Sequence, residues 1–213
     1  MLLACLSSLG FGTALVTSKL GLRFLDARSG AAISIPTATL LFIVASPFAL
    51  TASGFTLHAA LLFALVGLFF PAVVTLLTFQ SNDRLGPVVT SSVSSTAPLF
   101  ALVAAALLLG EDVPPKATLA SIGVVVGVTL LLWKPARLSF SSMGWALLLP
   151  IAGAMIRGLA QVVAKAGLLL WPNPFAASLI GYLVSSATVI AVNRLPRANR
   201  PSNVKAAIAA GLR

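Results

Sequence analysis

Two long apolar runs joined by a short polar turn, within residues 86–133, most restrict what this chain can fold into. As a helix, the run 86–110 is long enough to cross a hydrocarbon layer about 30 Å thick, and the run 117–133 lies near the short end of that range. The turn between them, residues 111–116, holds two acidic residues and two prolines, which suit the end of one helix and the first turn of the next. We expect Asp112 to cap the second helix. The pattern predicts a helical hairpin whose turn lies at a membrane surface.

Composition extends this conclusion to the whole chain. Of 213 residues, 59% are hydrophobic and 8% are charged, whereas about 25% are charged in an average soluble domain. A water-soluble fold of this length cannot bury so much apolar surface. The sequence therefore predicts an all-α membrane protein, a multispanning helical bundle in contact with the lipid bilayer. With one cysteine and one histidine, it predicts neither a disulfide framework nor a metal site, and we expect no cofactor.

The net charge of +10 does not indicate nucleic-acid binding here. The basic residues lie mostly in the loops between apolar runs, where they orient a protein in an anionic bilayer. They are concentrated in alternate loops, and this asymmetry alone would place the N-terminus outside the cell.

The apolar runs predict about seven full spans and the beginning of an eighth segment. Four of the spans contain internal prolines, which membrane helices tolerate when neighbouring groups satisfy the freed carbonyl. The eighth segment, 204–213, is too short to cross a bilayer. The expected spans are 2–18, 30–52, 57–80, 86–110, 117–133, 144–167 and 174–193.

The chain also contains an internal repeat. When it is shifted so that Lys19 falls on Lys165, Gly12 falls on Gly158 and the first span falls on the sixth without a gap. A unit of five helices is odd, so a second copy enters the membrane from the opposite face. This predicts inverted repeats, a transporter plan in which the substrate site lies near the midplane between the halves.

One stretch resembles a known family. A serine-rich helix leads to a proline, then to an apolar run, a Leu-Gly-Glu motif and a glycine-rich helix, which together resemble the signature of the EamA branch of the drug/metabolite transporter superfamily. The matching residues are Ser94, Ser95, Pro98, Leu109, Gly110, Glu111, Gly123 and Gly127.

The resemblance implies paired repeats of five transmembrane helices, ten in all, and carriage of small metabolites. We therefore expect a first EamA-like repeat at 1–133, an inter-repeat loop at 134–143, and the start of a second, truncated repeat at 144–213, with two helices and part of a third. The resemblance also implies an N-terminus in the cytoplasm, opposite to the charge asymmetry, and we follow the resemblance.

Arg157 is the leading candidate for the substrate pathway. It lies near the middle of the sixth span and shares one helical stripe with Gln161 and Lys165. A charge at this depth costs roughly 2.5–3.5 kcal/mol on insertion scales, so it should face protein or a wet cavity. An anionic substrate is one candidate partner. The alternatives are backbone carbonyls, Tyr182 or a further helix.

Lys19 and Lys165 occupy matching positions in the two repeats. At helix ends they suit interface anchors, and a role in the substrate pathway is the alternative. Ser94 and Ser95 either line the pathway or pack closely against another helix, and small residues favour packing. Pro98 predicts a kink and a candidate hinge.

Gly110 and Glu111 complete the family-like motif. Capping, or a bond to Lys116, would account for the glutamate without any part in transport.

Catalysis finds little support, because the sequence holds no phosphate loop, paired carboxylates, Ser/His/Asp set or metal spacing. We expect a permease, not an enzyme, in the cell membrane, which moves a small solute, anionic if Arg157 binds it, by alternating access. A non-transporting fragment or an assembly partner of a related carrier is the alternative. We also expect a homodimer as a candidate assembly and no nucleic-acid partner.

Overall fold

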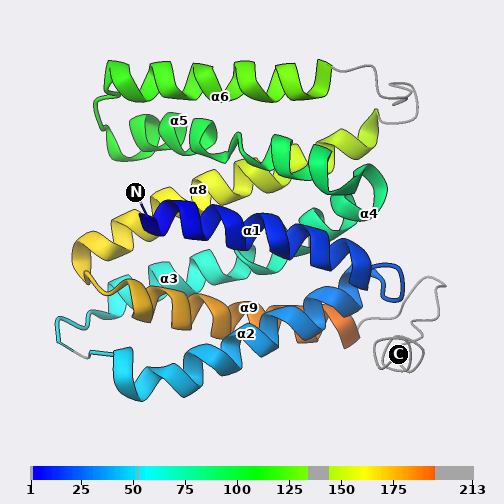
Figure 1. Ribbon diagram of the computed structural model, residues 1–213. Coiled ribbons are helices and arrows are strands. Elements are labelled where there is room, and N and C mark those ends of the chain that lie inside the picture. Colours follow the sequence, from blue (N-terminus) through cyan, green and yellow to red (C-terminus); the bar gives the residue numbers. More distant parts are fainter. Residues whose placement is uncertain (1, 52, 134–143, 195–213) are drawn as a thin grey trace.

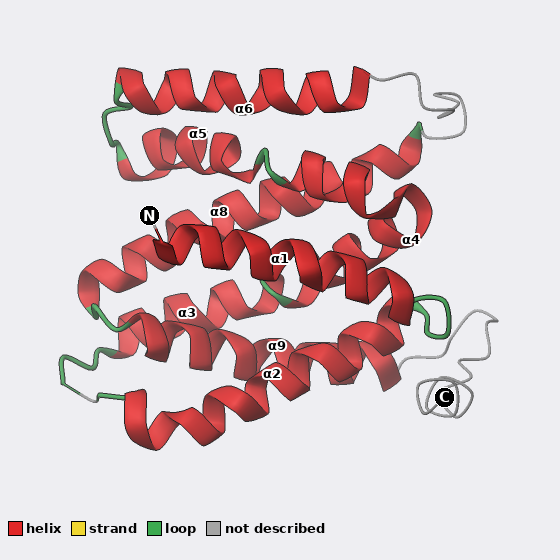
Figure 2. Cartoon of the chain, viewed as in Figure 1, coloured by secondary structure: helices red, strands yellow, loops and turns green. Residues whose placement is uncertain are grey.

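The computed structural model describes residues 2–51, 53–133 and 144–194, and all regular structure within them is helical (Figures 1 and 2). This confirms the all-α fold class. The predicted inter-repeat loop and the eighth apolar segment lie outside the described residues. The elements are α1 (Leu2–Gly21), α2 (Ala27–Ala49), α3 (Leu57–Phe69), α4 (Ala72–Ser94), α5 (Ala97–Leu109), α6 (Pro115–Trp133), the 3-10 turn η1 (Trp145–Leu147), α8 (Leu148–Leu170) and α9 (Pro174–Arg194).

The expected span 57–80 is not one helix, because α3 ends at Phe69 and α4 begins at Ala72, with a cis peptide bond between Phe70 and Pro71. A proline removes a helical donor and displaces the carbonyl four residues earlier, here that of Gly67. The Ser185 hydroxyl of α9 donates to this carbonyl and accepts a hydrogen bond from the Ala72 amide. A neighbouring helix thus satisfies the freed carbonyl, as the sequence analysis expects for membrane prolines.

The expected span 86–110 is also divided. Gly86, with φ of +79°, turns the chain sharply inside α4, so that residues 87–94 begin a new crossing. This crossing breaks again at Ser95 and Thr96 before α5, which carries Pro98 in its first turn. The chain is therefore kinked where the proline predicts.

The predicted hairpin is formed by α5 and α6. Gly110 ends α5 in the left-handed conformation, with φ of +62°, which glycine adopts without the steric cost of a side chain. The second helix begins at Pro115, so the expectation that Asp112 caps it is wrong: residues 110–114 are not helical, and the Pro114 carbonyl accepts the first hydrogen bonds of the helix. The prolines themselves set the start of the helix.

The central helix of the described bundle is α8, which packs against α3, α4 and α5, while α9 packs against α2 and α3. Small residues permit these contacts. A side chain at Gly67 would meet the Gly181 carbonyl at 2.6 Å, so α3 and α9 approach through glycine. This is the packing expected of helices that associate in lipid.

The shift that places α1 on α8 also places α2 on α9, and the two helices of each matched pair run in opposite directions. In Figure 1, α1 and α8 point opposite ways along the bundle, and so do α2 and α9. Leu2 and Gly21, the bounds of α1, correspond under the repeat to Leu148, the first residue of α8, and to Gly167 near its end. This antiparallel arrangement agrees with an inverted repeat, and the division of the whole chain into two repeats stays a prediction.

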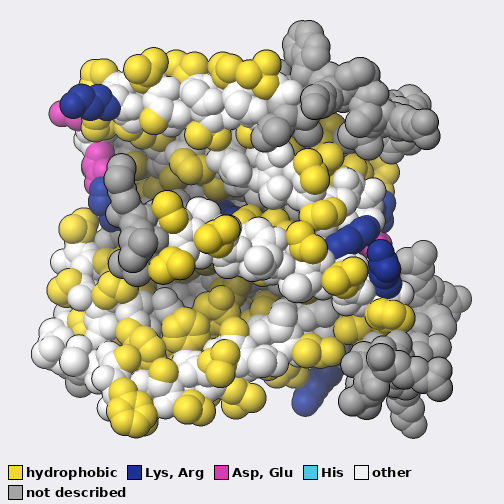
Figure 3. Space-filling view, viewed as in Figure 1, with side chains coloured by type: hydrophobic (Ala, Val, Ile, Leu, Met, Phe, Trp, Pro, Cys, Tyr) yellow, Lys and Arg dark blue, Asp and Glu magenta, His cyan; other side chains and the backbone are white. Residues whose placement is uncertain are grey.

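The outer surface suits a bilayer. Large apolar side chains are exposed along the helices, among them Phe48 at 92% and Leu107 at 79%. On the face shown in Figure 3, charged side chains gather at the two ends of the bundle. By length and composition, Ala27–Ala49, Leu57–Ser94, Trp145–Leu170 and Pro174–Arg194 are candidate spans, and the shorter apolar helices are Ala97–Leu109 and Pro115–Val128. Because Leu57–Ser94 contains the turn at Gly86, it makes one crossing and begins the next.

Candidate functional site

A cavity of about 230 Å³ lies where the broken α3/α4 helix meets α8 and α9. It is lined by residues from both predicted repeats: Phe63, Phe70 and Pro71 on one side, and Gln161, Ser178 and Tyr182 on the other. Most of its wall is apolar. A small cavity with few polar groups, between packed helices, is the usual form of a small-molecule site.

Arg157 lies one turn from this cavity. It precedes the lining residues Ala160, Gln161 and Ala164 by three, four and seven positions, so it continues their helical stripe. Its guanidinium carbon lies 5.0 Å from the ring centroid of Phe11 on α1 and 5.8 Å from that of Phe70, a cavity-lining residue. The cation thus lies over two aromatic rings and is half-buried.

The guanidinium has spare hydrogen-bonding capacity. Its Nε is buried and has no hydrogen-bond partner within the described part of the chain. The alternatives considered from sequence, backbone carbonyls or Tyr182, do not supply a hydrogen bond to it there. The ring faces attract the cation, but this attraction does not replace hydrogen bonds from its N–H groups to oxygen acceptors. The site can therefore accommodate an oxygen-bearing anion.

Lys165 continues the stripe to the end of α8. Its Nζ donates to both carboxylate oxygens of Glu111, at 2.6 and 2.7 Å. The expectation that capping or Lys116 accounts for Glu111 is therefore wrong, because its partner lies 54 residues away in the predicted second repeat. The pair joins the end of α8 to the turn between α5 and α6.

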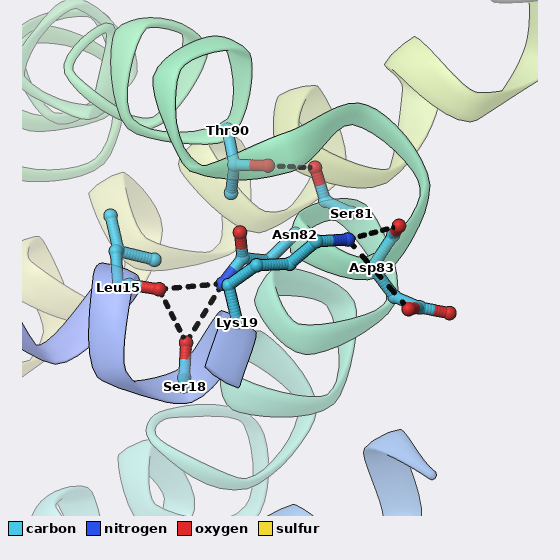
Figure 4. Close-up of polar contacts among 7 residues, drawn as sticks. All are labelled: Leu15, Ser18, Lys19, Ser81, Asn82, Asp83 and Thr90. Atoms are coloured by element: carbon cyan, nitrogen blue, oxygen red, sulfur yellow. Dashed lines mark hydrogen bonds and ion pairs between the residues drawn. The ribbon is translucent and has the colours of Figure 1, made fainter. Parts of the chain in front are cut away.

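Lys19, the matching lysine, lies at the end of α1 beside the turn in α4 (Figure 4). It donates to the backbone carbonyl of Asp83 at 2.5 Å, and the Asp83 carboxylate is 3.8 Å away. The α4 turn and the α5–α6 turn are separated by one crossing of the bundle. The two lysines therefore hold opposite ends of the bundle, each with a carboxylate of the first predicted repeat.

Ser94 and Ser95 do not line the cavity. The Ser95 hydroxyl donates to the Ser91 carbonyl of its own helix, whereas Ser94 is buried. Just after them, α5 packs closely on α8: a side chain at Gly158 would meet the Ala101 amide nitrogen at 2.7 Å and the Ala97 carbonyl at 2.8 Å. The kinked segment with Pro98 therefore contacts α8 beside Arg157.

Some structural residues were missed by sequence reasoning. Asn82 is fully buried and donates to the Leu15 carbonyl and the Ser18 hydroxyl, both at 2.8 Å, which anchors α1 (Figure 4). Beside it, the hydroxyls of Ser81 and Thr90 bond across the α4 turn at 2.8 Å. The available signal was a polar triplet, Ser-Asn-Asp, at the end of an apolar run.

A second groove, of about 400 Å³, is lined between α3 and α8 by apolar residues alone. It offers no group that would orient a polar solute. Within the described residues, no three His, Cys, Asp or Glu side chains come together as a metal site. The first cavity, which Gln161 lines and which Arg157 adjoins, is therefore the better candidate for a solute site.

Comparison with known proteins gives one match. The sequence model of the EamA-like transporter family matches residues 1–133, more than half of the chain. No curated protein and no solved structure matches the chain. The matched segment ends where α6 ends and includes the Leu-Gly-Glu motif.

Proposed function

Because the chain belongs to the EamA-like transporter family, a family of membrane transporters, we propose that it moves a small solute across the cell membrane by alternating access. In this proposal the solute passes between the repeat at 1–133 and the unit that begins at residue 144. Membership of the family makes the protein a membrane transporter. We propose in addition the path of the solute, its binding site and the location in the cell membrane.

The observation that carries the proposal is the cavity shared by the two predicted units. Its walls come from α3 and the Phe70–Pro71 break on one side and from α8 and α9 on the other. Broken helices at an interface between antiparallel units are the usual setting of a transporter binding site. A solute there would contact both units and would respond to their relative motion.

The remaining candidate residues take parts in the same cycle. Arg157 and Gln161 face the solute, while the pairs Lys165–Glu111 and Lys19–Asp83 close opposite ends of the bundle. Ser94, Ser95, Pro98 and Gly110 belong to the kinked arm around α5, which moves against α8 and carries the carboxylate partner of Lys165.

Cysteine accessibility tests alternating access without knowledge of the solute. Ser178 lines the cavity, and the only native cysteine, Cys5, is replaced by serine. In vesicles, we expect Ser178→Cys to react with a membrane-impermeant thiol reagent added from either side, because each face of the site opens in turn.

Leu107→Cys is the control, since this exposed position on α5 should face lipid. It should react from neither side. Reaction of Ser178→Cys from one side only, or from none, would contradict alternating access.

A further inference from the structure

We propose that Arg157 binds the negative group of the solute, and that the solute is a small monocarboxylate with an apolar body. The inference rests on the proposed transport function and gives the cavity a substrate class. Arg157 has no counter-ion in the described structure, a single guanidinium neutralises a single negative charge, and the cavity wall is mostly apolar.

None of the acidic side chains pairs with Arg157 in the part of the chain that the structure describes. The whole sequence holds four acidic residues, and all lie at helix ends or in turns. Two of them already pair with lysines, at opposite ends of the bundle. A cation taken out of water and left without a counter-ion is costly. The four are Asp26, Asp83, Glu111 and Asp112.

The surroundings of Arg157 favour a planar anion. The Phe11 and Phe70 rings lie about the guanidinium, at 5.0 and 5.8 Å from its carbon, while its Nε is unpartnered. Contacts with ring faces do not satisfy the N–H groups at the guanidinium edge, which stay available to an oxygen acceptor. A carboxylate matches that edge with two parallel hydrogen bonds.

The charge of the solute follows from the number of free cations. Lys165, two turns further along α8, already binds both oxygens of Glu111. Arg157 is therefore the one unpaired cation beside the cavity in the described structure. A monoanion is neutralised by it, whereas a dianion such as a phosphate monoester would keep one uncompensated charge in an apolar site.

The rest of the solute must be apolar and small. Phe63, Val66, Phe70 and Leu168 are among the apolar residues of the wall, and Gln161 adds an amide. The volume, about 230 Å³, lies below the roughly 300–1,000 Å³ of drug-sized pockets. One aromatic ring or a short branched chain fits this description.

Equilibrium binding tests the inference separately from transport. The full chain is placed in phosphatidylcholine nanodiscs, and binding of radiolabelled benzoate is measured against empty nanodiscs. We expect benzoate to bind and unlabelled benzoate to compete. Benzamide, which is neutral and of the same shape, phenylphosphonate and benzylamine should each compete at least about tenfold less well.

Variants assign the binding to Arg157. Arg157→Gln should lower benzoate affinity at least about tenfold. Arg157→Lys should lower it less, because lysine keeps the positive charge although it cannot form the two parallel hydrogen bonds. Lys116→Gln, which removes an exposed cation at the start of α6, is the matched control and should bind as the wild type does. Helical circular dichroism confirms that each variant is folded.

Three results would overturn the inference: no benzoate binding by the folded wild type, equal competition by benzamide or phenylphosphonate, or unchanged binding in Arg157→Gln. Benzoate binding without two-sided reaction of Ser178→Cys would contradict the transport cycle and leave the anion site standing. Reaction of Ser178→Cys from both sides without benzoate binding would support the transport cycle and contradict the anion site.

Discussion

Helices α1 and α8 are matched copies in the sequence, yet their surroundings differ. α8 packs against α3, α4 and α5, whereas α1 packs mainly against α4 among the described helices. A side chain at Gly158 would meet backbone atoms at 2.7 Å, but one at the matching Gly12 would meet nothing within 4 Å. The shared glycines therefore allow a close approach to either helix, but only α8 has a neighbouring helix that makes this approach.

The same contrast holds at the helix ends. A side chain at Gly167 of α8 would meet the Phe63 ring at 2.5 Å, while the space at Gly21 of α1 is open. In its second half, α1 is held by polar contacts: Asn82 binds the Leu15 carbonyl and the Ser18 hydroxyl, and Lys19 binds the Asp83 carbonyl. α8 is thus fixed by close packing, and α1 by a few hydrogen bonds.

The largest expected effect compares valine at the matched glycines. Gly158→Val should lower the free energy of unfolding by about 1–3 kcal/mol or more, because the α5 backbone must move. Gly12→Val should change it by less than about 0.5 kcal/mol, since the site is open. Denaturation in mixed micelles measures both, and the intrinsic helical preference of valine cancels between them. Equal losses would show that α1 has a close neighbour in the membrane.

A smaller effect concerns the anchor of α1. Asn82→Leu should lower the free energy of unfolding by about 1–2 kcal/mol, because it removes the buried amide that donates to the Leu15 carbonyl and to the Ser18 hydroxyl. The substitution should also make α1 more mobile. A nitroxide spin label on Cys5, the sole cysteine of the chain, would report this as a narrower electron paramagnetic resonance spectrum.

The control for this change is Asn173→Leu. Asn173 binds the Thr51 carbonyl at 2.9 Å and accepts from the Ala176 amide at the start of α9, far along the chain from α1. It should destabilise the protein without changing the Cys5 spectrum. If both variants narrow the spectrum, the mobility of α1 does not depend on Asn82.

Local patterns in the sequence predicted the helices, and tertiary contacts explain what they missed. The apolar runs located the crossings because each must bury its backbone polar groups in lipid. Pro71 signalled a freed carbonyl, but Ser185, which satisfies it, lies 114 residues later and looks like any small helical serine. Glu111 was compared with Lys116 nearby, whereas Lys165 is its partner.

The candidate site was predictable only in part. Arg157 and Gln161 stood out because polar groups are rare in apolar helices, and the 3.6-residue period put them on one stripe. The aromatic neighbours of Arg157 and the far wall of the cavity come from other helices, which no local pattern identifies. Ser94 and Ser95 were singled out for their hydroxyls, yet neither lines the cavity.

The smallest expected effect separates the two matched lysines. Lys165 is held by a carboxylate at 2.6 Å, while the Asp83 carboxylate lies 3.8 Å from Lys19, which bonds chiefly to a backbone carbonyl. Double-mutant cycles with glutamine and asparagine should therefore give a coupling of about 0.5 kcal/mol for Lys165–Glu111 and close to zero for Lys19–Asp83. Both pairs are partly exposed, so neither coupling should be large.

Salt then distinguishes the origin of the coupling. Raising the ionic strength from 0.01 to 1 M shortens the screening length from about 30 to about 3 Å, so a charge-based coupling at Lys165 should fall. The Lys19 contact should respond less, because the Asp83 carbonyl carries no net charge and Asp83→Asn leaves it in place. Equal couplings with equal salt dependence would mean that both ends of the bundle are closed by ion pairs of the same kind, and the difference between α1 and α8 would then be confined to their packing.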